Sequence, residues 1–423
     1  MIDSRGRLHT TAFGTRDRVT AFGRRPETYG ELGCGRPMWS HRQRELTREK
    51  FQKYDLDGDG EISAQELRSM LEDLHMRVGD DYLTMALQHF DTDQSGFIEF
   101  DEFEKLFSFL KNDGVIAPKP VVGPLSGRQV VQVACGEQHT AAVADDGTLW
   151  TFGRGGGRLG LQSLANTFEP TQVGGELGAE HVVSASCGEQ HTAVRTRSGA
   201  LYTFGRGSDG QLGHGDGVSC MQPKRVGGEL AGERVTRVSC GMSHVAVVVA
   251  DGQLFTFGRG GGRLGHAKMD NILAPKLVDA LSSVVVREVA CGAMHTAVVC
   301  EDGALYTFGR GSEGQLGHGG AGGQSRALLP TRVDTGDLTG AAVVGVDCGD
   351  QHTTVVTLDG HLVTFGLGKH TPARVVLAEA PAGSRGDGVS KFSSGRTFTA
   401  VLRDDGHLFT VGHTPSPETT AGK

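Results

Sequence analysis

The chain has 423 residues, 65 of them glycine and only 6% aromatic, and it carries a formal net charge of −8. This length exceeds what one small core needs, so we expect two or three folding units, and the glycine content indicates many tight turns. The first residues are polar and do not combine a basic with an apolar segment as an export signal does, and no apolar run approaches the roughly 20 residues that span a bilayer. The protein is therefore predicted to be intracellular, cytoplasmic or nuclear, with no membrane span.

The charge is concentrated in one region. Residues 1–40 carry +3, residues 41–113 hold 18 acidic and 9 basic side chains, and residues 114–423 sum to only −2. A large, nearly neutral domain lacks the basic surface that general nucleic-acid binding requires, so no nucleic-acid partner is predicted. The eight cysteines show no CxxC spacing, which indicates neither a zinc site nor a disulfide framework.

Two twelve-residue segments in the acidic region, DLDGDGEISAQE at 55–66 and DTDQSGFIEFDE at 91–102, match a calcium-binding loop position by position. Each has oxygen-bearing side chains at positions 1, 3 and 5, a glycine for the sharp turn at position 6, a backbone carbonyl at position 7 and a glutamate at position 12. The predicted ligands are Asp55, Asp57, Asp59, Glu61 (carbonyl) and Glu66 in the first loop, and Asp91, Asp93, Ser95, Phe97 (carbonyl) and Glu102 in the second.

All of these donors are hard oxygens, and a glutamate that offers two oxygens suits the large coordination shell of calcium better than magnesium or zinc. The sequence therefore predicts two Ca²⁺ ions. Two weaker interpretations remain open. The acidic residues could be only a solvated surface, or the loops could fold without metal, which is easier to imagine for the second loop because Ser95 replaces a carboxylate.

The flanks of both loops predict helices. Apolar residues follow each loop at helical spacing and form one stripe per helix: Leu67, Met70, Leu71 and Leu74 after the first, and Phe103, Leu106, Phe107 and Leu110 after the second. Ser63 and Glu66 form a capping signal, and Ile62 and Ile98 are placed to pair as short strands. The loops begin 36 residues apart, and this arrangement resembles one lobe of calmodulin or troponin C, which implies an all-α EF-hand pair.

After about residue 114 the chain becomes repetitive. A unit of the form VxCGxxHT followed by GxLYTFGRGxxGQLGHG recurs, with landmarks at Cys135, Cys187, Cys240, Cys291, Cys348 and Ser394, separated by 52, 53, 51, 57 and 46 residues. Short apolar segments bounded by glycine and Asp-Gly turns predict strands, and units of this size predict an all-β propeller. We therefore expect an EF-hand pair at 41–113, a linker at 114–127 and a propeller at 128–423.

These repeats resemble the regulator of chromosome condensation family over about residues 126–412. The resemblance implies a propeller of seven blades, with six as the alternative, because the fifth unit lacks GQLGHG and the sixth has Phe398 in place of the repeat histidine. Residues 6–36 contain GRLHTTAFG and YGELGCG, which echo the repeat. Residues 1–40 are thus either a partial repeat that completes the ring or a tail.

Two other patterns suggest chemistry but are better explained by the repeat. GxGxxG at 205–210 and 309–314 is not followed by a helix, so turn geometry explains it rather than a dinucleotide site. A histidine stands at the same place in five units, at His139, His191, His244, His295 and His352. A group repeated around a ring is more simply a hydrogen-bonding element than a catalytic base, and the repeated cysteines are interpreted as small buried apolar groups. No catalytic residue and no enzyme are predicted.

The sequence therefore predicts a calcium-responsive protein-interaction module on a propeller scaffold, with a protein partner that the sequence does not identify. Calcium is expected to open the helical pair and expose Met70, Met85, Phe103 and Phe107 as a groove. The family resemblance implies an alternative, a guanine-nucleotide exchange factor for a small GTPase regulated by calcium. A regulator in a ubiquitin or membrane-trafficking assembly is a third possibility with no sequence feature of its own.

Overall fold

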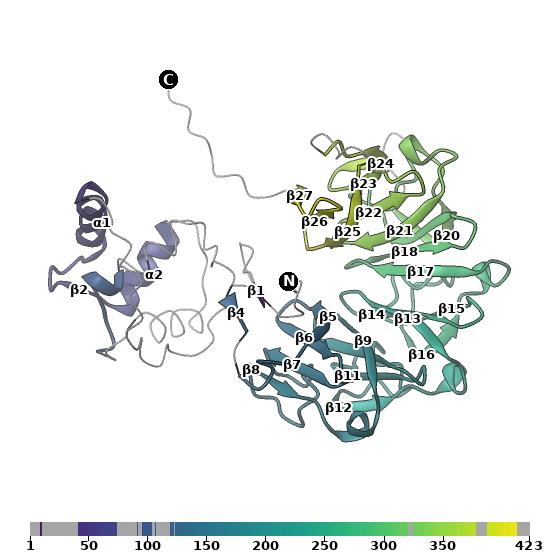
Figure 1. The fold of residues 1–423 in the computed structure, drawn as a ribbon, viewed down its shortest axis with the longest axis horizontal. Coiled ribbons are helices and arrows are strands. Elements are labelled where there is room, and N and C mark those ends of the chain that lie inside the picture. The colour runs from purple at the N-terminus through teal and green to yellow at the C-terminus, as the bar shows by residue number, and fades with distance from the viewer. Residues whose placement is uncertain are drawn as a thin grey trace. The chain divides into compact units, whose positions relative to one another are not determined.

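The computed structural model describes residues 9–10, 41–73, 91, 95–103, 106, 119–121, 123–319, 325–377 and 387–412. The chain forms two compact units, Met1–Gly127 and Arg128–Lys423, which are considered separately below. None of the described helices is both long enough and apolar enough to cross a membrane. Figure 1 shows the helical part of the first unit and the succession of sheets in the second.

The first unit contains helix α1 (His41–Tyr54), strand β2 (Glu61–Ile62), helix α2 (Ala64–Asp73) and strand β3 (Ile98–Glu99), and a further helix begins at Phe100. Helix α2 begins where the sequence predicts its cap. The amide of Ser63 donates to the Glu66 carboxylate at 2.9 Å, and the amide of Glu66 donates to the Ser63 hydroxyl at 3.3 Å. This reciprocal pair satisfies amides that the first helical turn leaves without a partner.

The apolar stripes form the core of this unit. Among the described side chains of the two stripes, Leu67, Met70 and Phe103 are fully buried and Leu106 is 2% exposed. The ring of Phe51, from α1, lies 5.2 Å from the ring of Phe103 in an edge-to-face arrangement. Burial of each such side chain contributes about 1.5–3 kcal/mol, so the stripes rather than helix propensity stabilise the pair. The side chains of Leu71, Leu74, Phe107 and Leu110 lie outside the described residues, as does Met85.

The second unit is a six-bladed propeller in the part of the chain that the structure describes, which is the smaller of the two blade numbers left open by the sequence. Each of five blades is an antiparallel sheet of four strands taken in chain order, and the sixth has three described strands. The first three blades are β5–β8 (Val130–Cys135, His139–Ala144, Leu149–Gly153, Thr167–Gln172), β9–β12 (Val182–Cys187, His191–Thr196, Leu201–Gly205, Cys220–Arg225) and β13–β16 (Val235–Cys240, His244–Val249, Leu254–Gly258, Ile272–Leu277).

The next three blades are β17–β20 (Val286–Cys291, His295–Cys300, Leu305–Arg310, Arg326–Arg332), β21–β24 (Val343–Cys348, His352–Thr357, Leu362–Gly366, Lys369–Arg374) and β25–β27 (Val389–Ser394, Phe398–Arg403, Leu408–Gly412). Short 3₁₀ turns follow the fourth strand of each of the first four blades, at Gly175–Ala179, Gly228–Leu230, Asp279–Leu281 and Gly336–Leu338. The predicted combination of an α-helical EF-hand pair and an all-β propeller is confirmed.

The core lies between the blades. In the second to fifth blades, the phenylalanine of the TFG segment is buried against the glycine that ends the GxLG segment of the preceding blade. For example, Gly213 has φ +71°, and a Cβ added there would lie 2.8 Å from the Phe257 ring. Gly160, Gly265 and Gly317 stand in the same relation to the phenylalanines of the blades that follow them. The recurring glycine of the repeat is therefore required both by backbone conformation and by close approach of the next blade.

The repeat histidines also join neighbouring blades. The Nε2 atom of His139 lies 2.8 Å from the hydroxyl of Thr192 in the next blade, and His244, His295 and His352 make the same contact at 2.9–3.0 Å with Thr296, Thr353 and Thr399. Burial lowers the pKa of His139 and His295 to about 3, so these imidazoles are neutral at physiological pH. Four of the five repeat histidines are thus structural hydrogen-bonding elements, as the sequence predicts, whereas the fifth, His191, makes no such contact.

The repeat cysteines are more varied than the sequence suggested. Cys240, Cys291 and Cys348 are buried, and the thiols of Cys240 and Cys291 each donate to a serine carbonyl of the preceding blade at 3.4 Å. Burial raises the pKa of both thiols to about 12, which keeps them protonated. Cys135, in β5 of the first blade, is exposed, so the interpretation of every repeat cysteine as buried is wrong there.

A further strand pair lies in the first unit. Strand β1 (His9–Thr10) pairs antiparallel with β4 (Lys119–Pro120), with Thr10 opposite Lys119 and His9 opposite Pro120. The third and fourth strands of a propeller blade pair in the same register. In the second blade Thr203 lies opposite Lys224 and Tyr202 opposite Arg225.

Candidate calcium sites

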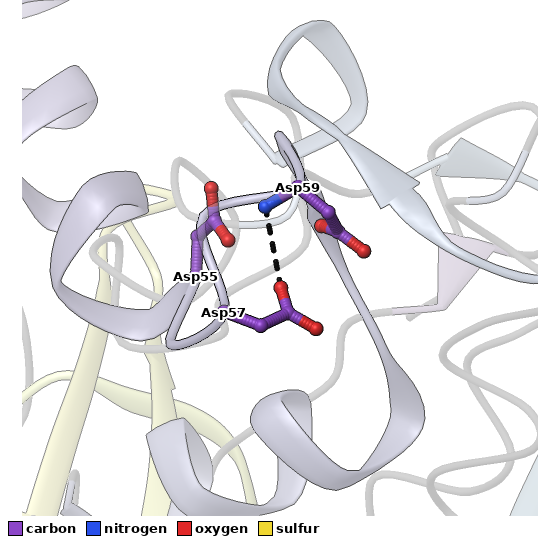
Figure 2. Close-up of side chains that lie close together, drawn as sticks. All are labelled: Asp55, Asp57 and Asp59. Carbon is purple, nitrogen blue, oxygen red and sulfur yellow. Dashed lines mark hydrogen bonds between the residues drawn. The ribbon is translucent and has the colours of Figure 1, made fainter.

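The first predicted loop is folded around its own carboxylates. Asp55 accepts hydrogen bonds from the amides of Gly58 at 2.8 Å and Gly60 at 3.1 Å. Asp57 accepts from the amide of Asp59 at 3.3 Å, and Asp59 accepts from that of Glu61 at 2.9 Å (Figure 2). These short-range bonds wind the chain into successive turns; both oxygens of Asp55 accept a bond, whereas Asp57 and Asp59 each accept through one oxygen.

The turn depends on glycine. Gly60 has φ +89°, and an added Cβ there would meet nothing within 4 Å. The requirement for glycine at position 6 is therefore one of backbone conformation alone.

The three aspartates of this loop come together. Each of Asp55, Asp57 and Asp59 offers a carboxylate oxygen, and these oxygens lie within 4.8 Å of one another. Asp57 and Asp59 are exposed, and Asp55 is half-buried. Like charges at this separation repel, and a divalent cation bound among them removes that repulsion. Carboxylate oxygens in this number and spacing fit calcium, although exposed acidic groups also gather in proteins that bind no ion.

Glu66, the predicted position-12 ligand, is held in place by both of its oxygens. Oε1 accepts from the amide of Leu56 at 2.7 Å, and Oε2 accepts from the amide of Ser63 at 2.9 Å and from its hydroxyl at 2.7 Å. The side chain is only 7% exposed. Burial raises the pKa of Glu66, but the hydrogen bonds from Ser63 and Leu56 outweigh it and leave the pKa below its usual value. The Glu66 carboxylate is therefore ionised, and its Oε1 is held at Leu56, near the start of the loop.

The second loop repeats this geometry. Asp91 accepts from the amides of Ser95 at 3.0 Å and Gly96 at 2.9 Å, and Gly96 has φ +89°, the value found at Gly60. The amide of Glu99 donates to Glu102 at 3.3 Å, as that of Ser63 does to Glu66. Asp91 and Glu102 are 8% and 5% exposed. Asp93 lies outside the described residues.

Strands β2 and β3 join the two loops. Ile62 lies opposite Ile98 and Glu61 opposite Glu99, and both isoleucines are fully buried. This is the short pairing predicted from position 8 of each loop. One antiparallel pair thus connects the backbones of the two loops directly.

The predicted carbonyl ligands lie on the same segments. Glu61 and Phe97 stand at position 7, one residue before the paired isoleucines, and the side chain of Phe97 is 39% exposed. The sequence did not indicate the bond from the Leu56 amide to Glu66. A backbone donor has no residue-type signal, so only the folded loop reveals it.

Comparison with known proteins agrees with this geometry. Residues 44–108 match the family model described as an EF-hand domain pair, and residues 105–422 match that of the RCC1-like domain. The chain belongs to the RCC1-like domain family. The suspected union of an EF-hand pair with regulator of chromosome condensation repeats is confirmed, and in this RCC1-like chain the EF-hand pair precedes the propeller.

Several curated proteins are similar to the RCC1-like region. The chain is 35% identical over 296 residues to the human E3 ubiquitin-protein ligase HERC2, covering 67% of this chain and 6% of that protein. It is 32% identical over 295 residues to the ultraviolet-B receptor UVR8 of Arabidopsis thaliana, covering 67% of this chain and 65% of that protein. The chain thus spans less than two thirds of the length of either relative.

Solved structures agree on the fold. Human WBSCR16 superimposes with a TM-score of 0.62 at 22% identity, covering 70% of this chain and 78% of that one. Yeast RCC1 (Prp20), solved bound to Kap60, gives a TM-score of 0.59 at 17% identity, covering 71% and 74%. At these identities the likeness concerns the RCC1-like propeller fold alone.

Proposed function

We propose that this RCC1-like protein binds one Ca²⁺ ion in each EF-hand loop and acts as a calcium-responsive protein-interaction module. The observation that carries the proposal is the convergence of Asp55, Asp57 and Asp59 within 4.8 Å, beside a Glu66 carboxylate that is ionised and fixed. The first ion is held by these four carboxylates and the Glu61 carbonyl. The second is held by Asp91, Asp93, Ser95, Glu102 and the Phe97 carbonyl.

Isothermal titration calorimetry of the full chain with CaCl₂ tests the binding. We expect two ions per chain for the natural protein and one each for Glu66→Gln and Glu102→Gln. Glu61→Gln is the matched control, because Glu61 contributes only its carbonyl and the substitution should leave two ions bound. A natural protein that takes up no calcium overturns the proposal.

The proposed response of the EF-hand pair to calcium depends on the apolar core of the helical unit. Met70 and Phe103 are fully buried between the helices, so opening of the pair would expose side chains suited to an amphipathic helix of a partner. Calcium should then increase binding of the dye ANS, and Glu66→Gln should reduce the increase. Calcium uptake without a change in ANS fluorescence would indicate a structural or buffering site instead.

The alternative, a guanine-nucleotide exchange factor regulated by calcium, rests on the fold. Prp20p of Saccharomyces cerevisiae, a solved structure with a similar fold, has binding properties toward Gsp1p and histones. At 20% identity that property is not carried to particular residues here. Nucleotide release from small GTPases, measured with and without calcium, distinguishes this activity from a binding role.

A further inference from the structure

An arginine stands at the end of the third strand or directly after it in each of the first four blades, in the segment FGRG. These residues are Arg154, Arg206, Arg259 and Arg310. In the second and fourth blades the same loop supplies partners. Arg206 donates to the Ser208 hydroxyl at 2.8 Å and lies 3.9 Å from Asp209. Arg310 donates to Ser312 at 2.7 Å and lies 4.0 Å from Glu313.

In the first and third blades the loop reads RGGGR and supplies no acid. Its second arginine, Arg158 or Arg263, is only 6% exposed. Arg263 donates through Nε to the Gly260 carbonyl at 2.9 Å and through Nη1 to the Ala293 carbonyl at 3.0 Å. These bonds satisfy two nitrogens without neutralising the charge, and a buried charge without a counter-ion is costly.

Three arginines lie around this loop of the third blade: Arg259, Arg263 and Arg326, called the arginine cluster below. Arg326, from strand β20 of the next blade, lays its stem against the same loop, since a Cβ added to Gly262 would lie 3.2 Å from its Cγ. Arg259 and Arg326 both act on Arg263 electrostatically and, together with burial, lower its pKa to about 10. Among the described residues, no carboxylate lies within the 4.0 Å ion-pairing distance of any of the three arginines. Asp209 acts on Arg263 only from beyond that distance.

The first blade differs because its neighbouring turns are acidic. Burial and the neighbouring Arg154 lower the pKa of Arg158, and the electrostatic influence of Glu137 and Glu189 opposes this shift. The equivalent turns beside Arg263 read Met242-Ser243 and Ala293-Met294 in place of Glu-Gln. The amide of Arg259 donates to the Ser243 carbonyl at 2.8 Å, which places this turn beside the cluster.

Two methionines give the cluster an apolar border. Met242 is 37% exposed and Met269 is 49% exposed. The sulfur of Met269 lies 3.1 Å from Nη1 of Arg326. Arginine and methionine are both enriched where proteins bind one another, and uncompensated arginines favour partners with complementary charge.

We propose that Arg259, Arg263 and Arg326 bind an oxyanion carried by a peptide segment of a protein partner, either carboxylate or phosphate, while Met242 and Met269 pack on neighbouring apolar residues of that segment. The oxyanion supplies the counter-charge that the third blade lacks. Arg259 and Arg326, both exposed, contribute most of the donors, and the buried Arg263 fixes the position of the anion.

The test uses the full chain and three fluorescent peptides of equal length. Each peptide places two leucines among three residues of glutamate, phosphoserine or glutamine. Fluorescence anisotropy should show binding of the glutamate or phosphoserine peptide, and the tighter of the two identifies the source of the oxyanion. The double variant Arg259→Ala/Arg326→Ala should weaken that binding by about tenfold or more, as expected for the loss of charged hydrogen bonds at an interface.

The first blade provides the control. Arg154→Ala removes the equivalent exposed arginine of the acid-flanked loop and should change the affinity by less than about twofold. The proposal fails if the glutamine peptide binds as well as the charged ones, if neither charged peptide binds, or if Arg154→Ala weakens binding as much as the double variant. Tighter binding of a DNA duplex than of either charged peptide, lost in the same double variant, would overturn it in favour of a nucleic-acid site.

Discussion

Val245 occupies the place from which, in other blades, a threonine hydroxyl reaches the histidine of the preceding blade, and both ring nitrogens of His191 lack a hydrogen-bond partner among the described residues. The equivalent Thr192 accepts a hydrogen bond from Nε2 of His139 and donates its own hydroxyl hydrogen to the Arg158 carbonyl at 2.8 Å. Valine and threonine have nearly the same shape, so the substitution removes hydrogen bonds while filling the space.

Val245→Thr should therefore stabilise the propeller. The new hydroxyl can serve His191 and the Gln211 carbonyl, as Thr192 serves His139 and the Arg158 carbonyl, for a gain of about 0.5–1.5 kcal/mol in the free energy of unfolding. Thr296→Val is the matched control, because it removes the contact to His244 and should cost about 1–3 kcal/mol. Urea unfolding of the full chain measures both, and a destabilised Val245→Thr protein would contradict the assignment.

Much of the molecule could be predicted from local patterns. The predicted EF-hand ligands and the apolar stripes occupy fixed offsets within a few residues, so both can be predicted from the sequence alone. The dipeptide His-Thr was visible as well, but its contact joins residues 47–58 positions apart in different blades. Only the packing of blades shows which threonine meets which histidine. The cluster of Arg259, Arg263 and Arg326 could not be predicted for the same reason, since Arg326 comes from another blade.

The buried histidines predict sensitivity to acid. Burial lowers the pKa of His139 and His295 to about 3 and that of His191 and His352 to about 4, whereas an unfolded histidine titrates near 6.5. Between these values the unfolded chain binds more protons than the folded one, so the free energy of unfolding falls as pH decreases from about 6.5 toward 3. Each histidine contributes up to about 1.4 kcal/mol per pH unit in that window.

Asp347 changes the free energy of unfolding with pH in the opposite direction to the histidines. Burial raises the pKa of Asp347 to about 6, so between its unfolded value and 6 the folded state holds one extra proton and gains stability as pH falls. Four histidines outweigh one aspartate. Urea midpoints at pH 7, 6, 5 and 4.5 should decrease steadily, and Asp347→Asn should make the decrease steeper. A midpoint that does not change from pH 7 to 5 would show that the histidines are not buried neutral.

Replacing a glycine that faces a repeat phenylalanine by alanine should destabilise the protein in two separable ways, through backbone strain and through steric overlap. Gly213→Ala introduces a Cβ 2.8 Å from the Phe257 ring at a φ of +71°, so strain and steric overlap combine. Gly215→Ala is the control, because its φ is +83° but nothing lies within 4 Å of the added Cβ. We expect about 1–2 kcal/mol of destabilisation for Gly215→Ala from backbone strain alone, and about 1–3 kcal/mol more for Gly213→Ala from overpacking. If both variants lower the thermal stability equally, the Phe257 ring moves away from the added Cβ at no cost in free energy, and the expected overpacking is absent.

The register of β1 with β4 makes a prediction about the N-terminal segment. Thr10 lies opposite Lys119, and His9 lies opposite Pro120. In the same way, Thr203 lies opposite Lys224 and Tyr202 opposite Arg225 in the second blade. Leu125 is buried four residues after Val121, as Leu230 is buried four residues after Val226. The same segment then leads into the first strand of the next blade, β5, as the segment after β12 leads into β13.

We therefore predict that residues 9–10 and 119–120 are the third and fourth strands of a further blade, with the EF-hand pair inserted in the connection between them. Directly opposed residues of an antiparallel pair are close enough for a disulfide, so Thr10→Cys/Lys119→Cys should cross-link on mild oxidation, as read by mass spectrometry of the full chain. Thr10→Cys/Pro120→Cys, offset by one residue and directed to the other face, should not. Equal cross-linking of both pairs would exclude a fixed register. Selective cross-linking would show that a strand pair with the register of a propeller blade joins the two ends of the segment that contains both predicted calcium loops.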